Sequence, residues 1–267
     1  MSESTEFEEK EPSGEQSEFI EMLRTASPDA LRELVEAPSL KEEQVMLLLA
    51  RKDLAGELIE ELAQRKGLLK SYAVKKALVV HPHTPRLISL RMLRDLYLMD
   101  LVQVTLTPGA LAELKRNAEA QLIARLPQLP LGQKITLARR GPGRVAGELL
   151  AEGNPHVLTI ALDNSNLNEA HVLKALSKVK LAPRVVEAVA HHPKWSSSYN
   201  VRMALVRQPA ATLSTVLAYL PEITVSDLKV LAEPGVVTEN LRRYLLAEIQ
   251  RRIIRGKDAK PGPSEPS

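Results

Sequence analysis

The chain contains an internal repeat, in which residues 27–103 align with residues 154–230 at a constant offset of 127 positions. Of the 77 aligned pairs, 21 are identical. The longest matches pair Ser71-Tyr72-x-Val74 with Ser198-Tyr199-x-Val201, and Ala77-Leu78-Val79-x-x-Pro82 with Ala204-Leu205-Val206-x-x-Pro209. Self-similarity of this kind predicts one structural block that occurs twice.

The periodicity inside the block is helical. Leu31, Leu34 and Val35 recur at the i, i+3, i+4 spacing of a buried helix face, and no segment alternates as a strand would. The first copy is expected to form helices at about 28–37, 40–52, 54–66, 71–80, 85–97, 100–106 and 109–126. The second copy should repeat this series from about 155 to 254, with a one-residue slip in the loop before its last helix.

Helix starts also recur in the two copies. Ser27-Pro28 and Asn154-Pro155 each place an acceptor at the N-cap and proline in the first turn. Ser39-x-x-Glu42 and Asn166-x-x-Glu169 are interpreted as capping boxes. Asp100 and Asp227 each precede an apolar run and are expected to be N-caps.

Many short helices broken by proline predict stacking, because a short helix pair cannot bury its apolar face alone. The expected fold is all-α, a right-handed HEAT-like solenoid with a concave and a convex face, built from two copies of a block of about 100 residues. The expected boundaries are 17–126 for the first block, 127–153 for connecting short helices and 154–255 for the second block. Two separate helical domains are the alternative.

Composition limits the function classes. Cysteine is absent, which excludes disulfides and thiol chemistry and favours a reducing compartment, so the cytoplasm is expected. No signal peptide is visible, and no apolar stretch approaches the roughly 18–20 residues of a membrane span.

Charge is distributed unevenly along the chain. Residues 1–18 hold seven Glu and one Lys, a net charge of −6, so residues 19–267 carry +9 of the total of +3. Residues 1–16 and 256–267 lack hydrophobic periodicity and are expected to be disordered tails. The acidic tail either keeps the protein soluble or shields the basic body from polyanions.

Residues 192–220 and 71–93 resemble the leucine-rich repeat variant, a helical solenoid repeat, and the whole body is more loosely similar to HEAT-like repeats. The similarity rests on Pro193, Trp195, Val201, Arg202, Ala204, Leu205 and Pro209, and on Val74, Ala77, Pro82, Thr84 and Pro85. Thr84-Pro85 is expected to start the next helix. His81 and Gln208 replace the Asn that the family places before proline, and without cysteine no iron–sulfur site carries over. The resemblance implies a fold and leaves the function open.

Several residues could have chemical roles, and each has a structural explanation. The pairs His81/His83 and His191/His192 lack further metal ligands, so loop and helix-end positions are favoured over a metal site. Trp195 aligns with Leu68, which favours packing over ligand stacking. Tyr72 and Tyr199 match, and each hydroxyl is expected to bond a loop carbonyl. Arg140-Gly141-Pro142-Gly143-Arg144 is expected to be a turn, with a basic contact loop as the alternative.

No catalytic residue is predicted. The repeated acids obey the repeat, whereas a functional site usually breaks one; they are Glu42, Glu169, Glu60, Glu187, Asp100 and Asp227. None has a histidine or nucleophile as an evident partner for acid–base chemistry. No cofactor or metal is expected. An enzyme like the HEAT-like DNA glycosylases would need more aromatic residues than the 3% found here.

The leading hypothesis is therefore a non-catalytic scaffold that binds another protein, acidic in character, through its basic concave surface. The binding surface is expected where the copies differ, and the first copy is more basic at Arg65, Lys66, Lys70, Arg91 and Arg94. The chain's own residues 3–18 could compete for this surface. The alternative is sequence-nonspecific nucleic-acid binding by the basic body, with little base stacking.

Overall fold

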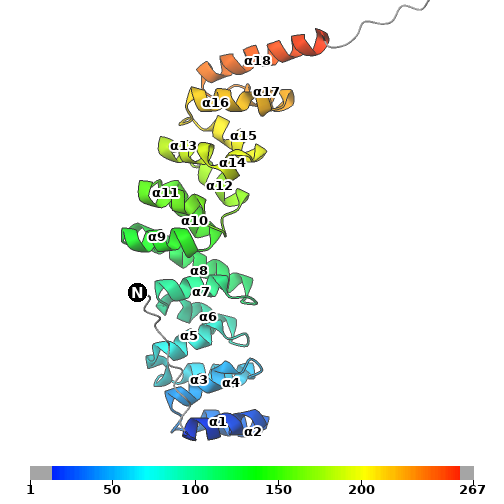
Figure 1. Cartoon of the computed structure of the whole chain (residues 1–267). Coiled ribbons are helices and arrows are strands. Elements are labelled where there is room, and N and C mark those ends of the chain that lie inside the picture. The colour runs from blue at the N-terminus through cyan, green and yellow to red at the C-terminus, as the bar shows by residue number, and fades with distance from the viewer. Residues whose placement is uncertain (1–13, 259–267) are drawn as a thin grey trace, which may run out of the picture. The chain divides into compact units, whose positions relative to one another are not determined.

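A computed structural model describes residues 14–258, and all regular secondary structure in that range is helical, as predicted (Figure 1). Contacts divide the chain into two units, with the boundary between Leu122 and Ile123, inside one helix. Within residues 14–258, no helix has both the length and the apolar character of a membrane span.

The first unit contains eight α-helices, the last of which extends past its boundary. They are α1 (Gly14–Thr25), α2 (Pro28–Glu36), α3 (Glu42–Ala50), α4 (Gly56–Gln64), α5 (Tyr72–Val80), α6 (Arg86–Met92), α7 (Leu98–Leu106) and α8 (Ala112–Arg125). Two 3₁₀ turns, η1 (Leu68–Lys70) and η2 (Leu93–Asp95), lie between them.

The second unit contains the remaining helices. They are α9 (Leu131–Arg140), α10 (Gly143–Glu152), α11 (Pro155–Leu162), α12 (Glu169–Leu176), α13 (Pro183–His191), α14 (Pro193–Ser196), α15 (Tyr199–Arg207), α16 (Leu213–Tyr219), α17 (Val225–Leu231) and α18 (Glu239–Asp258). The 3₁₀ turns η3 (Leu126–Gln128) and η4 (Leu220–Glu222) precede α9 and α17.

Within each unit, helices that alternate along the chain lie side by side in rows. In the first unit α3 contacts both α1 and α5, while α2 contacts α4. In the second unit α12 contacts α10 and α15, while α11 contacts α9 and α13. The two helices expected to connect the blocks, α9 and α10, are therefore members of these rows. Their apolar residues, including Leu137, Val145 and Leu149, are buried in the unit.

Several residues that align at the offset of 127 are buried in both units. Leu31 and Leu158, Val45 and Val172, and Leu78 and Leu205 are all buried. The last long helices also match, because Leu114, Ala118 and Leu122 of α8 and Leu241, Leu245 and Ile249 of α18 are buried at the same offset of 127. The one-residue slip is confined to the preceding loop, where Gly109 and Gly235 both adopt positive φ.

The proline-containing helix starts are confirmed. The Ser27 hydroxyl accepts the N–H of Ala30 and the Asn154 side chain accepts the N–H of His156. The two expected capping boxes are wrong by two residues, because α3 and α12 begin after Lys41 and Asn168. Thr84 is also not an N-cap: Pro85 holds that position, and the Thr84 hydroxyl donates to the Leu78 carbonyl instead.

Both tails extend mostly outside the described residues. Residues 14–16, assigned to the acidic tail, belong to α1, whose Leu23 is buried. Residues 256–258, assigned to the other tail, continue α18. The remaining tail residues, 1–13 and 259–267, are not described, and their expected disorder stays a prediction.

The glycine-bearing segment after α9 forms the expected turn. Gly141 ends α9, Pro142 is the N-cap of α10 and Gly143 is its first residue. A Cβ on Gly143 would come within 2.0 Å of the Asn166 carbonyl oxygen, so the lack of a side chain permits this close approach. Asn166 and Asn164 in turn donate to the Gly141 carbonyl.

Side-chain donors connect consecutive helices of a row. A residue at the C-terminal end of one helix donates to a carbonyl at the C-terminal end of an earlier helix, which would otherwise have no intrahelical partner. In the first unit, Arg51 donates to the Leu23 carbonyl, and His81 Nε2 lies 2.7 Å from the Arg51 carbonyl oxygen. In the second unit, Gln208, which aligns with His81, donates to the Leu176 carbonyl.

A tyrosine–aspartate pair recurs in both units. The Tyr72 hydroxyl donates to Asp100 and accepts the N–H of Tyr97, the N-cap of α7. Tyr199 does the same with Asp227 and Thr224 at the start of α17. Both aspartates lie in the first turn of the helix, so they are not N-caps, and the tyrosine partners are not loop carbonyls. Because the carboxylate lies near the positive end of a helix, the arrangement stabilises the helix start.

Removal of one tyrosine hydroxyl tests this pair. Burial alone would raise the pKa of Asp100, but hydrogen bonds from Lys76 and Tyr72 outweigh it and lower that pKa. Tyr72→Phe is expected to reduce the free energy of unfolding by about 1–3 kcal/mol at pH 7. A carboxylate whose pKa is lowered in the folded state stabilises the folded protein at pH values above its unfolded-state pKa. This stabilisation is lost as the pH falls. The difference between the two proteins, measured by urea denaturation, should therefore shrink below about pH 4.

The buried His81 predicts acid sensitivity. Burial lowers its pKa, and its Nδ1 accepts the N–H of His83, so the neutral ring is the form that fits. A histidine whose pKa is lowered in the folded state stabilises the folded protein at pH values above its unfolded-state pKa of about 6.5. This stabilisation is lost as the pH falls. His81→Gln, which installs the residue found at position 208, should lose less stability between pH 7 and pH 5 in thermal melts. An equal loss in both proteins would contradict this assignment.

Candidate binding site in the first unit

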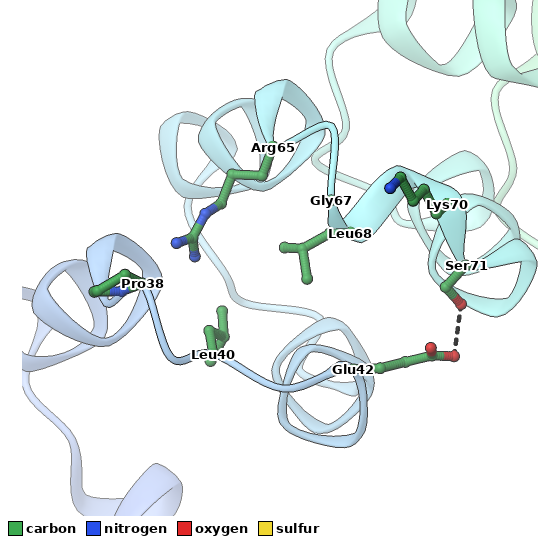
Figure 2. Close-up of a pocket in the computed structure, with 8 residues that line it drawn as sticks. All are labelled: Pro38, Leu40, Glu42, Arg65, Gly67, Leu68, Lys70 and Ser71. Atoms are coloured by element: carbon green, nitrogen blue, oxygen red, sulfur yellow. Dashed lines mark hydrogen bonds between the residues drawn. The ribbon is translucent and has the colours of Figure 1, made fainter.

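A cavity of about 580 Å³ lies in the first unit between the α2–α3 turn and the α4–η1 turn (Figure 2). Its lining is Pro38, Leu40, Glu42, Arg65, Gly67, Leu68, Lys70 and Ser71. Figure 2 shows the side chains of Leu40, Arg65 and Leu68 directed into one space from three segments of the chain. The volume lies in the range of about 300–1,000 Å³ typical of sites that enclose a ligand.

Arg65 is a fixed positive charge at this cavity. Its Nη1 and Nη2 atoms donate to the carbonyls of Val35 and Ala37 at the end of α2, each at 2.8 Å. These acceptors are neutral, and Arg65 forms no ion pair with any residue between 14 and 258. The guanidinium is therefore held in place while its charge stays uncompensated by a carboxylate in that range.

Two lysines add charge around Arg65. Lys66 and Lys70 are exposed, and neither side chain makes a hydrogen bond or ion pair with the described part of the chain. Lys70 lines the cavity, whereas Lys66 lies in the turn beside it. The Glu42 carboxylate accepts a hydrogen bond from the Ser71 hydroxyl at 2.6 Å. The name "basic pocket" is used below for this cavity together with Arg65, Lys66 and Lys70.

The structure does not bring all five predicted binding residues to this cavity. Arg91 lies in α6 and Arg94 in η2, and neither lines the cavity. Both are exposed, and Arg94 has an interaction partner of its own. The five residues thus divide into the basic pocket and a separate pair.

The same place in the second unit is built differently. Leu68 aligns with Trp195, which is 3% exposed and whose indole N–H donates to the Leu162 carbonyl at 3.0 Å. Leu162 aligns with Val35, whose carbonyl takes its hydrogen bond from Arg65. The two copies therefore satisfy the matched carbonyl with different donors. In the second copy a buried indole does so, and in the first copy an arginine does so beside an open cavity.

Two of the other cavities lie at matching positions of the two copies. One of about 250 Å³ is lined by Val79, His81, Pro82 and Ser89, among others, and one of about 380 Å³ by Val206, Gln208, Pro209 and Val216, which are the same positions shifted by 127. A cavity shared by both copies follows from how the layers pack. The basic pocket differs because it lies where the two sequences diverge.

The histidines have partners within the helical body. His83 Nδ1 lies 2.8 Å from the Leu54 carbonyl oxygen, and His192 Nε2 lies 3.1 Å from a carboxylate oxygen of Asp163. Among residues 14–258, no three His, Cys, Asp or Glu side chains are grouped as metal ligands. The acids Glu42 and Glu169 each accept a serine hydroxyl, from Ser71 and Ser198, while Glu60 and Glu187 are exposed.

No family model matches this chain, and no curated protein is significantly similar to it. The assignment of the site therefore rests on the residues themselves.

The sequence predicted the cations of the basic pocket but not the cavity. Two signals were available in the aligned copies. Leu68 stands opposite the only tryptophan, and Arg65 stands opposite His192. Together they indicate that the first copy has less side-chain volume and more positive charge than the second copy in this segment. The alignment does not show that Arg65 and Trp195 donate to carbonyls at aligned positions, those of Val35 and Leu162.

Truncation of Trp195 tests its packing role. Trp195→Ala is expected to lower the free energy of unfolding by about 3–5 kcal/mol, because it leaves a buried cavity and an unsatisfied carbonyl. Leu68→Ala is the matched control and should cost less, since Leu68 is half-buried beside an existing cavity. Chemical denaturation of both variants checks this. A larger loss for Leu68→Ala would contradict the difference between the copies.

Proposed function

We propose that this chain is a non-catalytic helical-repeat scaffold that binds an acidic segment of another protein through the basic pocket of its first unit. The observation that carries the proposal is Arg65, a positive charge positioned by two backbone carbonyls and without an ion-pair partner among the described residues. A charge held this way needs little reorganisation to receive a carboxylate.

Several other basic residues of the body already have a carboxylate partner, which supports the choice of this pocket. Lys75 and Lys76 pair with Asp95 and Asp100, and Arg202 pairs with Glu222. The second-unit lysines Lys174 and Lys178 share Glu148, and Arg251 and Arg252 share Glu248. A cation that already has a carboxylate partner contributes less to the attraction of an acidic ligand.

The finer architecture belongs to the same proposal. Each unit is proposed to be a short right-handed array of stacked helical layers, similar to HEAT-like and leucine-rich repeat variant proteins. The support is that tyrosine–aspartate and serine–glutamate contacts recur at an offset of 127 residues. The lack of cysteine fits a cytoplasmic setting.

Binding of nucleic acid is the less favoured function. A protein that follows a phosphate backbone needs a row of cations that are free to neutralise phosphates. Lys75, Lys76, Lys174 and Lys178 already have carboxylate partners, which leaves them less free to neutralise phosphates. Base stacking would also need exposed aromatic residues, and Tyr97 and Tyr244 are the exposed examples among the described residues.

Charge reversal tests the proposal. The double variant Lys66→Glu and Lys70→Glu should weaken capture of an acidic partner about tenfold, which corresponds to ~1.4 kcal/mol. The melting temperature should change little, because both side chains are exposed. The measurement is affinity capture from a lysate of the native host, with and without nuclease, followed by titration of the captured protein.

A second double variant controls for net charge. Arg139→Glu and Arg140→Glu change exposed residues of the second unit by the same total charge. This control should retain capture. Equal loss in both variants would show that only the overall charge matters, and undiminished capture by the first variant would remove the basic pocket from the proposal. Capture that disappears with nuclease would favour nucleic acid.

A further inference from the structure

The basic pocket occupies the place that an aromatic side chain fills in the second unit. Trp195 lies there with Lys194 Nζ 4.2 Å from the centre of its ring and His192 beside it. In the first unit the aligned residues are Leu68, Gly67 and Arg65, so the ring is missing, the lysine is missing, and an arginine replaces the histidine. The cavity of about 580 Å³ lies at this position.

The lining of the cavity has the chemistry of a site for an aromatic ring. Leu40 is buried and Leu68 is half-buried, and with Pro38 they supply apolar contact surface. The Arg65 guanidinium is directed into the same space and can lie against the face of a ring (Figure 2). The first unit therefore has an open cavity at the position aligned with Trp195.

The charges around the cavity indicate which residues of a ligand would flank a bound aromatic ring. Lys70 lines the opening and Lys66 lies in the adjacent turn, and both lack partners in the described range. The acid at the cavity, Glu42, is engaged by Ser71. Carboxylates next to an aromatic side chain would meet these lysines, whereas basic neighbours would be repelled.

We infer that the basic pocket binds an aromatic side chain of a partner protein, tryptophan above all, in a segment with carboxylates on both sides. This inference rests on the proposed function and names the ligand of the same site. The aromatic side chain supplies the buried area and the carboxylates supply orientation, as in interfaces where one anchor residue carries most of the binding energy.

The test compares two peptides of equal charge, fluorescein-labelled Glu-Glu-Trp-Glu-Glu and Glu-Glu-Ala-Glu-Glu, by fluorescence anisotropy on the full chain. The chain carries Phe7→Ala, because its own Glu6-Phe7-Glu8-Glu9 has the same chemistry as the probe and would compete. The tryptophan peptide should bind at least about tenfold more tightly, as expected when an aromatic side chain leaves water.

A transplant of the second-unit residues should close the site. Arg65→His together with Leu68→Trp reproduces the His192 and Trp195 pair, so that the new indole can take over the Val35 carbonyl and fill the cavity. This double variant should lose the preference for the tryptophan peptide. Lys66→Ala, which also removes one positive charge but leaves the cavity open, should keep it. A preference that survives in the double variant would overturn the inference.

A measurement on the unmodified pocket keeps the test valid if the double variant does not fold. In the Phe7→Ala chain, ring currents from the tryptophan peptide should shift the methyl signals of Leu40 and Leu68, and the alanine peptide should not. Absence of these shifts at saturating peptide would overturn the inference.

Salt dependence distinguishes this inference from the proposed function. If both peptides bind equally and binding weakens with salt, the aromatic site is wrong and the acidic-partner proposal stands. If only the tryptophan peptide binds and salt has no effect, the pocket stands and the acidic-partner proposal is wrong. If neither peptide binds, both are wrong.

Discussion

The structure depends on how the ends of its short helices are satisfied. Most helices here have only seven to ten residues, so a large share of their carbonyls lack an intrahelical partner. A left-handed glycine, which often caps such ends, closes α10 at Gly153, whereas α2 to α5 end in extended residues. Side chains of a neighbouring helix supply the missing donors. The hydrogen bonds that complete the end of one helix therefore also hold the neighbouring helix in place. The stability of each helix thus depends on the order in which the helices stack.

This dependence explains which features of the fold could be predicted from the sequence. Apolar positions such as Val45 and Leu78 recur because every layer must bury the same face, so the helices and their order could be predicted from periodicity. The starts at Ser27 and Asn154 were readable because the cap and the proline are adjacent in sequence. The capping boxes failed because the helices begin two residues later, where the Gln44 side chain accepts the N–H of Lys41 and the Asn168 side chain accepts the N–H of His171.

The side-chain donors that connect neighbouring helices could not be predicted from the sequence, because several types of side chain can donate a hydrogen bond to the same carbonyl. Arg51, His81, Asn164, Trp195 and Gln208 all donate to carbonyls near helix ends about 23 to 33 residues earlier. A carbonyl requires only an N–H at the correct distance, so residue identity can change while the path of the backbone is kept. Alignment of the two copies shows such positions as divergent, and divergence alone cannot separate a replaced donor from a binding residue.

Arg65 is both a replaced carbonyl donor and a candidate binding residue. It belongs to the set of carbonyl donors, since it completes the end of α2, and it also brings a charge that the indole of Trp195 does not. Its loss would expose two carbonyls and remove a binding group together, so alanine at this site would confuse stability with affinity. Replacement of the donor by the one that the other copy uses keeps a donor for the Val35 carbonyl while the charge and the cavity disappear, and only the Ala37 carbonyl loses its partner. The repeat thus supplies a matched control variant for the position at which the two copies differ.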